Sequence, residues 1–346
     1  MKKGFQRLVT ILLVLALALA MAMATGMGEE QNQPRIVCLA PSMVEVVFAL
    51  GYGDAIVGWS QFTDYPVEVT ERKGWVPYEK YEWVSIDDEL SKDVAVVSGF
   101  TNYNAELVKE LNPTLILAES SMQQAMYEEL KAEGYNILFF DPASLDEVYE
   151  MMRQVGGALG AEDVAQALIT GYREKIDEIQ SITKELPKLK IYYEIAHKKD
   201  YDGTFYGPYT AGTGTPLDQM IEIAGGTNVF DNMEGGYVGV EFEDIVKANP
   251  DVILSPMWPN AGDDEVTTLY EIMSREGFSE ISAVQTGRVL YYDSSLFKRY
   301  GPRTITAIEK LAYLLHPYYF TNPSDSVSPW ELGRIDKAYP APAPLR

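Results

Sequence analysis

The sequence predicts an α/β protein of two lobes, each with a central, mainly parallel sheet flanked by helices, joined by one long α-helix. Short apolar strands alternate with helices in both halves of the chain, a pattern typical of parallel β-α units. One helix-to-strand motif occurs twice, once in each half, and a largely helical stretch separates the copies. These observations indicate two similar lobes and a helical connection.

The repeated motif begins at Glu106 in the first half and at Glu243 in the second. The copies read Glu-Leu-Val-Lys-Glu-Leu-Asn-Pro-Thr-Leu-Ile-Leu and Glu-Asp-Ile-Val-Lys-Ala-Asn-Pro-Asp-Val-Ile-Leu. Each predicts a short helix that ends at Asn-Pro, because proline lacks an N–H and restricts the residue before it, and then a buried strand. The helix dipole alone favours a glutamate in a first turn, but equivalent positions in two lobes suggest a partner that contacts both.

The other elements follow the same alternation. The first half predicts a strand at 36–39, a helix at 43–50 and a strand at 55–59. The second half predicts a strand at 190–195, a loop rich in Gly, Tyr and Thr, a helix at 217–223 and a short strand at 228–230.

Helical periodicity extends over 145–186, with an interruption near Gly156, Gly157 and Gly160. The predicted helix over 161–185 would extend on the order of 37 Å, enough to cross from one lobe to the other. A single helical connection predicts lobes that move little.

The predicted segments are a secretory signal peptide at 1–24, an N-terminal lobe at 34–143 with an insertion at 67–92, a connecting helical segment at 144–186, a C-terminal lobe at 187–317 and an extended tail at 318–346. The leader has a basic start, an apolar run and a small-residue end. A membrane anchor is the alternative, but the run is shorter than the ~20 residues of a spanning helix. No cysteine lies near the expected cleavage site, so we expect a periplasmic or extracytoplasmic protein that is not lipid-anchored through an N-terminal cysteine.

The charge balance excludes one class of partner. The formal net charge is −23, and removal of the three basic residues of the leader takes it to −26. Such a chain repels phosphate backbones and anionic lipid surfaces, so we expect no nucleic-acid partner. Cys38 is the one cysteine, so no intramolecular disulfide forms and stability must come from apolar cores.

The residue types give catalysis little support. The two histidines are His197 and His316, and we expect the second to lie at a helix C-terminus. No Gly-x-Ser-x-Gly, His-Glu-x-x-His or phosphate-loop motif occurs. Although Tyr, Asp and Glu could bind a hard cation, we expect no catalytic residue, no metal site and no cofactor of the protein's own. An exported chelate-processing enzyme is the alternative from another class.

Aromatic residues gather at predicted strand ends, where an open α/β sheet places its ligand. The predicted ligand-binding aromatic residues are Phe62, Phe100, Tyr206, Tyr209, Tyr237, Trp258 and Phe297. The insertion adds Trp75, Tyr81 and Trp83, which could cover a cleft between the lobes. Aromatic surfaces suit a bulky ligand with apolar faces. For any single tyrosine, ordinary half-buried packing is the alternative.

These motifs resemble those of the substrate-binding proteins of ABC importers, in the helical-backbone class (class III) that carries ferric siderophores, haem and cobalamin. The resemblance covers about 34–316. It rests on Arg-Ile-Val-Cys-Leu-Ala-Pro-Ser at 35–42 with Glu45, Thr-Asp-Tyr-Pro at 63–66, both Glu/Asn-Pro motifs, the run 217–228 and Gly-Pro-Arg at 301–303.

The resemblance implies that Glu106 and Glu243 dock into arginine pockets of an ABC importer permease. It also implies that the ligand binds in the cleft between the lobes. The family's ligand positions fall on Pro41, Ser42, Phe62, Phe100, Tyr237 and the loop that includes Ser295, Phe297 and Arg299. We expect a monomer that delivers a small-molecule chelate to the permease.

A ferric siderophore is the first ligand expected, because Arg299, Lys298 and Arg72 would favour an anionic chelate against the acidic background. A corrinoid such as cobalamin needs aromatic surface and little charge, and haem would need a tyrosine as iron ligand; both are alternatives. A sensor that signals through a receptor would use the same docking surfaces as an importer.

Overall fold

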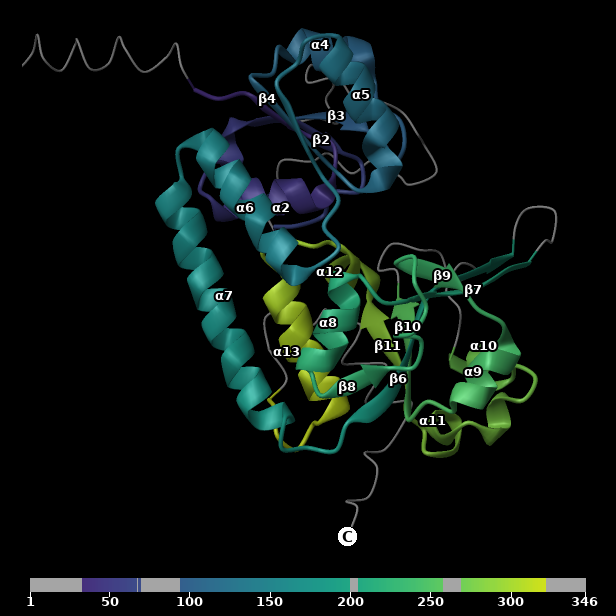
Figure 1. Ribbon diagram of the computed structural model, residues 1–346. Helices are drawn as coiled ribbons and strands as arrows, with labels where there is room; N and C mark the ends of the chain where they lie inside the picture. Colours follow the sequence, from purple (N-terminus) through teal and green to yellow (C-terminus); the bar gives the residue numbers. More distant parts are fainter. Residues whose placement is uncertain (1–32, 67, 70–93, 200–204, 258–268, 322–346) are drawn as a thin grey trace, which may run out of the picture.

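The computed structural model describes residues 33–66, 68–69, 94–199, 205–257 and 269–321. These residues form two lobes with long helices along one side (Figure 1). The predicted signal peptide, nearly all of the insertion with Trp75, Tyr81 and Trp83, the predicted ligand residue Trp258 and the tail beyond 321 lie outside the described residues. Within the described ranges, no helix is both long enough and apolar enough to cross a membrane.

The N-terminal lobe contains a five-stranded sheet in which all neighbouring strands are parallel. In spatial order the strands are β3 (Ala95–Ser98), β2 (Ile56–Ser60), β1 (Ile36–Cys38), β4 (Leu115–Glu119) and β5 (Ile137–Phe140). The helices are α2 (Pro41–Ala49), α4 (Ala105–Leu111) and α5 (Gln124–Ala132), with short 3-10 turns at Gly53–Ala55 and Ser121–Gln123. β1 and β3 are buried throughout, as expected of a parallel sheet covered on both faces.

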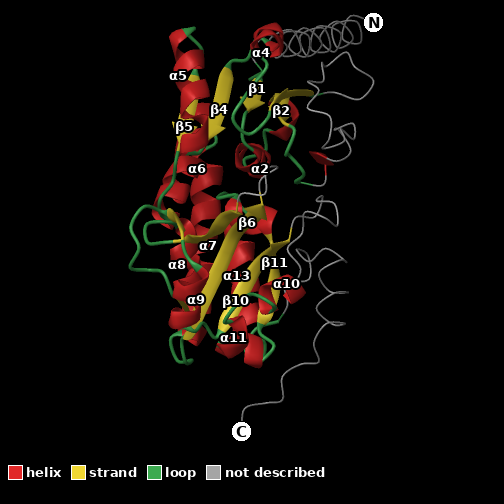
Figure 2. Cartoon of the chain, turned by 90° about the vertical axis from the view of Figure 1, so that its right-hand side faces the viewer, coloured by secondary structure: helices red, strands yellow, loops and turns green. Residues whose placement is uncertain are grey.

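The C-terminal lobe contains a six-stranded mixed sheet. Its strands are β11 (Val289–Asp293), β10 (Val252–Met257), β6 (Leu189–Lys199), β7 (Phe205–Ala211) and β9 (Tyr237–Gly239) in spatial order, with β8 (Gly226–Asn228) paired to β6. The β11, β10, β6 and β8 pairings are parallel, and β7 is antiparallel to β6 and β9. The helices are α8 (Pro216–Ile223), α9 (Phe242–Ala248), α10 (Leu269–Met273), α11 (Ser282–Gln285), α12 (Ser294–Lys298) and α13 (Thr304–Leu315), with a 3-10 turn at Phe278–Glu280. Figure 2 shows the two sheets one above the other along the long axis of the molecule.

Three segments predicted as loops are regular elements. Tyr206 and Tyr209 lie in β7, Tyr237 lies in β9, and Phe297 lies in α12. Aromatic and β-branched residues favour strands, and β6 supplies a hydrogen-bonding partner for β7 by continuing to Lys199. The Gly and Pro residues within 205–211 favoured a loop. A local sequence pattern does not show that β6 extends far enough to pair with this segment.

Two antiparallel helices, α6 (Leu145–Leu159) and α7 (Glu162–Thr183), connect the lobes (Figure 1). The expected interruption falls at Gly160, where α6 ends with φ 70°, whereas α6 runs through Gly156 and Gly157. A Cβ at Gly156 would lie 2.8 Å from the Ala165 Cβ, so this glycine allows the two helices to approach closely. α7 has 22 residues and therefore extends about 33 Å.

One continuous cluster of buried apolar residues extends through both lobes. It includes Ile36 and Val44 from the N-terminal lobe, Val155 from α6, and Leu217 and Ala307 from the C-terminal lobe. Two further clusters fill the outer sides of the sheets. Separation of the lobes would expose part of the shared core to water, at a free-energy cost of about 25 cal/mol per Å² of apolar surface. The shared core therefore opposes large interlobe movement.

The repeated motif has the same local structure in both lobes. α4 and α9 have seven residues each, and each ends at an asparagine in the left-handed conformation, Asn112 with φ 44° and Asn249 with φ 45°. Asparagine tolerates this conformation better than most residues. A proline follows each asparagine, and the parallel strands β4 and β10 begin two residues later.

Candidate functional site

Ser42 and Glu119 form a polar pair at the carboxyl end of the N-terminal sheet. Ser42 lies in the first turn of α2, after Pro41, and Glu119 is the last residue of β4. The Ser42 hydroxyl donates a hydrogen bond to Glu119 Oε2, and the Glu119 N–H donates to Gln123 Oε1 at 3.2 Å. Burial raises the pKa of the Glu119 carboxyl to about 7, because desolvation disfavours the charged form. The Glu119 carboxyl is therefore held in place as a hydrogen-bond acceptor, and its charge changes near neutral pH.

Two phenylalanines provide the aromatic surface of this lobe. Phe62 follows β2 and Phe100 follows β3, and their rings meet edge to face with centroids 6.2 Å apart. Phe100 is 50% exposed and Phe62 is half-buried. The sequence predicts each as a ligand residue at a strand end, and the structure adds that the two rings meet and leave apolar area open to a ligand.

In the C-terminal lobe, Tyr237 and Tyr300 form a hydroxyl pair with their oxygens 2.5 Å apart. Tyr237 is 48% exposed, whereas Tyr300 is buried. Burial raises the pKa of Tyr237, and the negative charges of Glu119 and Asp141 raise it further. Glu119 also raises the pKa of Tyr300. The hydroxyl pair of the C-terminal lobe is therefore within electrostatic reach of carboxylates of the N-terminal lobe.

Arg299, predicted to bind the ligand, already binds Asp64 of the opposite lobe. Its Nη2 lies 3.1 Å from Asp64 Oδ2 and 2.9 Å from the Phe62 carbonyl oxygen, and its Nη1 contacts Asp64 Oδ1. The Ser295 hydroxyl, 3.4 Å away, also donates to Asp64. Lys298 donates to the Ile195 carbonyl at 2.7 Å, and burial lowers its pKa to about 7. Both cations are thus engaged within the protein.

A second ion pair joins the lobes between Glu45 and Arg303. Arg303 Nη2 lies 2.6 Å from Glu45 Oε1, and Nε lies 2.9 Å from Oε2. The Arg303 guanidinium also stacks 4.1 Å from the Tyr65 ring centroid. Burial raises the pKa of the Glu45 carboxyl while Arg303 opposes that rise. The bidentate geometry makes this pair a fixed link between α2 and the start of α13.

The structure corrects the prediction for Phe297. Its side chain is fully buried and packs against Tyr193 and Tyr292, with ring centroids 6.3 and 5.3 Å away. α12 directs Leu296 and Phe297 into the core and leaves Ser295 and Arg299 partly exposed. Phe297 therefore supports the site from behind and presents no surface to a ligand. Tyr209 is exposed on β7.

Two residues near this site were missed by the sequence reasoning: Glu119 and Asp141. Glu119 and Asp141 directly follow the apolar stretches of β4 and β5. A carboxylate at the end of a buried parallel strand was the available signal. Tyr300 ends the run Phe297-Lys-Arg-Tyr, one of the aromatic segments expected at the ligand site.

Glu106 and Glu243, predicted to dock on a permease, occupy matching positions. Each is the second residue of its helix, α4 or α9, and each is exposed. Neither forms an ion pair with a basic side chain of the described residues. The helices that carry these glutamates, α4 and α9, lie in separate lobes (Figure 1).

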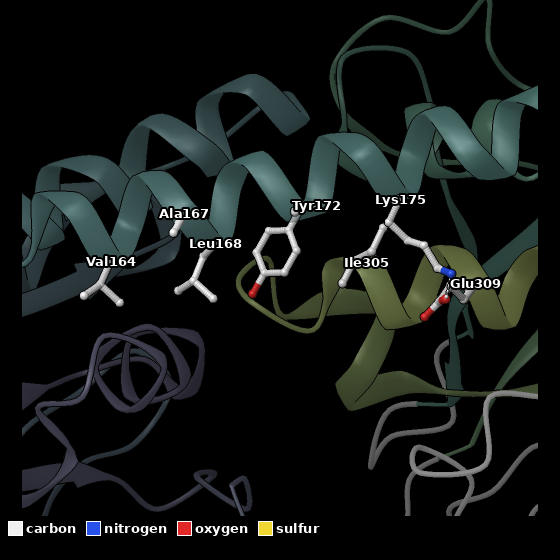
Figure 3. Close-up of a pocket in the computed structure, with 8 residues that line it drawn as sticks. Val164, Ala167, Leu168, Tyr172, Lys175, Ile305 and Glu309 are labelled. Carbon is white, nitrogen blue, oxygen red and sulfur yellow. Dashed lines mark ion pairs between the residues drawn. The ribbon is translucent and has the colours of Figure 1, made fainter.

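A groove of about 480 Å³ lies elsewhere, between α7 and α13. Its sides are apolar, with Leu168, Tyr172 and Ile305 pointing into it, and the Lys175–Glu309 ion pair closes one end (Figure 3). It contains none of the predicted ligand residues. The groove belongs to the helical connection and not to the strand ends.

The described residues offer no group of three or more His, Cys, Asp or Glu side chains that could hold a metal ion. His316 lies at the end of α13, as the sequence predicts, and its Nε2 is 3.4 Å from the Gly225 carbonyl oxygen. Burial lowers its pKa. Cys38 is buried as a small core residue.

A family model described as periplasmic binding protein matches residues 36–296. The uncharacterised ABC transporter substrate-binding lipoprotein YvrC of Bacillus subtilis is 32% identical over 84% of this chain and 82% of its own length. A cobalamin-binding protein of Halobacterium salinarum is 26% identical over 83% of this chain and 70% of its own length.

Solved structures show the same fold. A possible iron-binding protein from Staphylococcus epidermidis is 26% identical, with a TM-score of 0.64 over 82% of this chain and 100% of that one. The vitamin B12-binding protein BtuF of Vibrio cholerae is 22% identical, with a TM-score of 0.62 over 82% of this chain and 96% of that one. These relatives are solute-binding proteins and not enzymes. The chain therefore belongs to the periplasmic binding protein family, as a class III substrate-binding protein of an ABC importer.

Proposed function

We propose that this substrate-binding protein captures a corrinoid between its lobes. The observation that carries the proposal is the ion pair between Arg299 and Asp64, which neutralises the cation expected to attract an anionic ligand. Glu119 and Asp141 add negative charge beside Tyr237. A largely uncharged chelate with apolar faces suits this surface and the Phe62–Phe100 pair. The cobalamin-binding relative of Halobacterium salinarum supports the same class.

A ferric siderophore, the first expectation from the sequence, is the second candidate. It rested on Arg299, Lys298 and Arg72; the first two bind protein atoms, and Arg72 lies outside the described residues. The Staphylococcus epidermidis structure described as possibly iron-binding favours it. Haem has less support, because coordination by Tyr237 would require its phenolate and burial raises the pKa of that hydroxyl.

Delivery of the ligand is the second part of the proposal. Glu106 and Glu243 would enter basic sockets of the permease, one from each lobe. The connecting helices and the shared core would keep the two carboxylates at a nearly constant separation, which gives the permease a fixed pattern to recognise. The expected exported location and monomeric state agree with this role.

Titration of the mature protein, followed by intrinsic fluorescence, tests the ligand. We expect cyanocobalamin to quench fluorescence at micromolar concentration or below, and an anionic ferric siderophore and haemin to bind at least tenfold more weakly. Tighter binding of the ferric siderophore than of cyanocobalamin would favour the siderophore as the ligand. No quenching by any of the three would remove this ligand class.

A further inference from the structure

The connecting helix α7 has two apolar faces. One packs into the shared core, where Ala165 and Ile169 are buried. The other includes Val164, Ala167 and Gly171, which lie three and four residues apart and are all exposed, Val164 by 45%. Residues at this spacing share one side of a helix, and a solvent-facing side is normally polar. The second face is therefore a surface suited to a further contact.

This second face is one wall of the groove between α7 and α13. Leu168 and Tyr172 of α7 and Ile305 of α13 point into the groove (Figure 3). The ion pair between Lys175 and Glu309, with Nζ and Oε1 3.2 Å apart, closes one end. The volume of about 480 Å³ is typical of pockets that bury drug-sized ligands. An apolar groove of this size can accept large side chains.

The chain that follows α13 leaves the fold near this groove. α7 and α13 run in the same direction, because Lys175 pairs with Glu309 and the ends of both helices lie at Gly225. A Cβ at Gly225 would be 2.6 Å from His316 Nε2 and 3.1 Å from the Thr183 Cβ. From Glu309 to His316 the chain covers about 10 Å of helix. The chain therefore leaves α13 close to the ion-paired end of the groove.

The tail beyond α13 is long enough to return to the groove. Phe320 packs against the shared core, next to Thr321, the last described residue. Trp330 follows nine residues later, and nine extended residues span up to ~30 Å. The groove runs along α7 from Lys175 toward Val164, about 16 Å of helix. Added to the 10 Å along α13, this length is within the reach of Trp330.

The residue types of the tail match the groove. Trp330, Leu332 and Ile335 are three large apolar residues within six positions. Large aromatic and aliphatic side chains are the usual anchors of a peptide that binds in an apolar groove. Glu331 and Arg334 lie between them, and their charges have opposite signs, as do the charges of the ion pair at the end of the groove. The segment 330–335 therefore complements the groove in both apolar surface and charge.

We propose that the segment 330–335 docks in the groove between α7 and α13 of its own chain, with Trp330 and Leu332 as apolar anchors. The segment and the groove belong to one chain, so the effective concentration is on the order of millimolar. A second copy of the protein at micromolar concentration competes poorly with it. The docked segment joins the connecting helix to a helix of the C-terminal lobe, and the proposal does not depend on the identity of the ligand.

Labelling of one introduced thiol tests this docking in the full mature chain. Gly171 lines the groove, and no described atom lies within 4 Å of a Cβ at this position, so the cysteine of Gly171→Cys has room there. Cys38 is buried and does not compete for a maleimide reagent. The docked segment should shield the new thiol. We expect Trp330→Ala with Leu332→Ala to raise its labelling rate at least tenfold, as a segment docked about 90% of the time requires.

Glu174→Cys is the matched control, because Glu174 is exposed on α7 but does not line the groove. Its labelling rate should not respond to the two tail substitutions. A synthetic peptide of residues 322–346, added at about 1 mM to match the effective concentration, should restore protection of the Gly171→Cys thiol in the variant without anchors. Equal labelling rates with and without the Trp330 and Leu332 side chains would overturn the proposal. Protection that increases with protein concentration would also overturn it, because a second copy would then cover the groove.

Discussion

Arg299 of the C-terminal lobe is bound to Asp64 of the N-terminal lobe, 235 residues earlier in the chain. The same guanidinium donates to the Phe62 carbonyl at 2.9 Å, so it holds the loop that carries the Phe62 ring. Arg299 therefore stabilises the aromatic surface and joins the lobes, while its charge is compensated inside the protein. Arg299 therefore lies at the ligand site without offering an uncompensated positive charge to an anionic ligand.

Removal of the Asp64 charge should change ligand preference. In Asp64→Asn the Arg299 cation has no carboxylate partner, so we expect the affinity for an anionic ferric siderophore to rise about tenfold, equivalent to ~1.4 kcal/mol. Binding of uncharged cyanocobalamin should change less than threefold. Glu133→Gln, an equal charge change at an exposed position, is the control for fluorescence titrations. An unchanged preference would show that Arg299 does not govern ligand charge.

Charge reversal at the docking positions should separate capture from transport. The double variant Glu106→Arg, Glu243→Arg should bind ligand as wild type does, because both side chains are exposed on α4 and α9. Uptake through the matching permease should fall at least tenfold, since like charges would meet in the sockets. Glu110→Arg with Glu280→Arg makes the same charge change at other exposed positions and should import normally. Normal uptake by the Glu106→Arg, Glu243→Arg variant would show that the two glutamates have no docking role and only stabilise the starts of their helices.

The buried ion pair beneath α9 should matter for stability. Glu194 accepts from Arg275 at 2.5 and 3.0 Å and from the Tyr192 hydroxyl at 3.0 Å, and Arg275 stacks 5.0 Å from the Phe242 ring centroid. Arg275→Met leaves the Glu194 charge buried and unpaired, so we expect a loss of about 3–5 kcal/mol in the free energy of unfolding. Urea denaturation measures this loss.

Two further variants test whether the loss of stability in Arg275→Met comes from the unpaired Glu194 charge. The double variant Glu194→Gln, Arg275→Met should recover part of the loss, because it removes the stranded charge. Arg153→Met breaks the exposed Arg153–Glu150 pair and should cost under ~1 kcal/mol. A loss for Arg275→Met as small as that of Arg153→Met would contradict the account.

The sequence predicted the features that depend on local chemistry. The ends of α4 and α9 at Asn-Pro follow from proline geometry. The alternation of strands and helices follows from apolar periodicity. The places of Phe62 and Phe100 after strands β2 and β3 agree with the predicted strand ends.

Features that depend on distant partners were not predictable from local patterns. The β6–β7 hairpin needed a partner strand that continues to Lys199, and Phe297 needed Tyr193 and Tyr292 around it to become core. Arg299 could be placed at the site, but the ion pair that compensates its charge needs Asp64 from the opposite lobe. The sequence therefore locates the residues of such a site more readily than it predicts the ion pairs that those residues form.

Glu119 should make the stability of the ligand-free protein depend on pH. Burial raises its pKa from 4.5 to about 7, so between those values the folded state binds more protons than the unfolded state. The free energy of unfolding contributed by this group therefore falls as pH rises through that range. Each pKa unit corresponds to ~1.4 kcal/mol, and the partial exposure of Glu119 reduces the expected effect to about 1–2 kcal/mol.

Glu119→Gln removes this titration and keeps a side chain that Ser42 can still contact. Urea unfolding at pH 5 and pH 8 should show the variant gaining about 1–2 kcal/mol relative to wild type over that interval. Glu128→Gln should show no such gain, because its carboxylate is exposed on α5. If the two variants responded equally to pH, Glu119 would be ionised throughout the range, contrary to the effect of its burial.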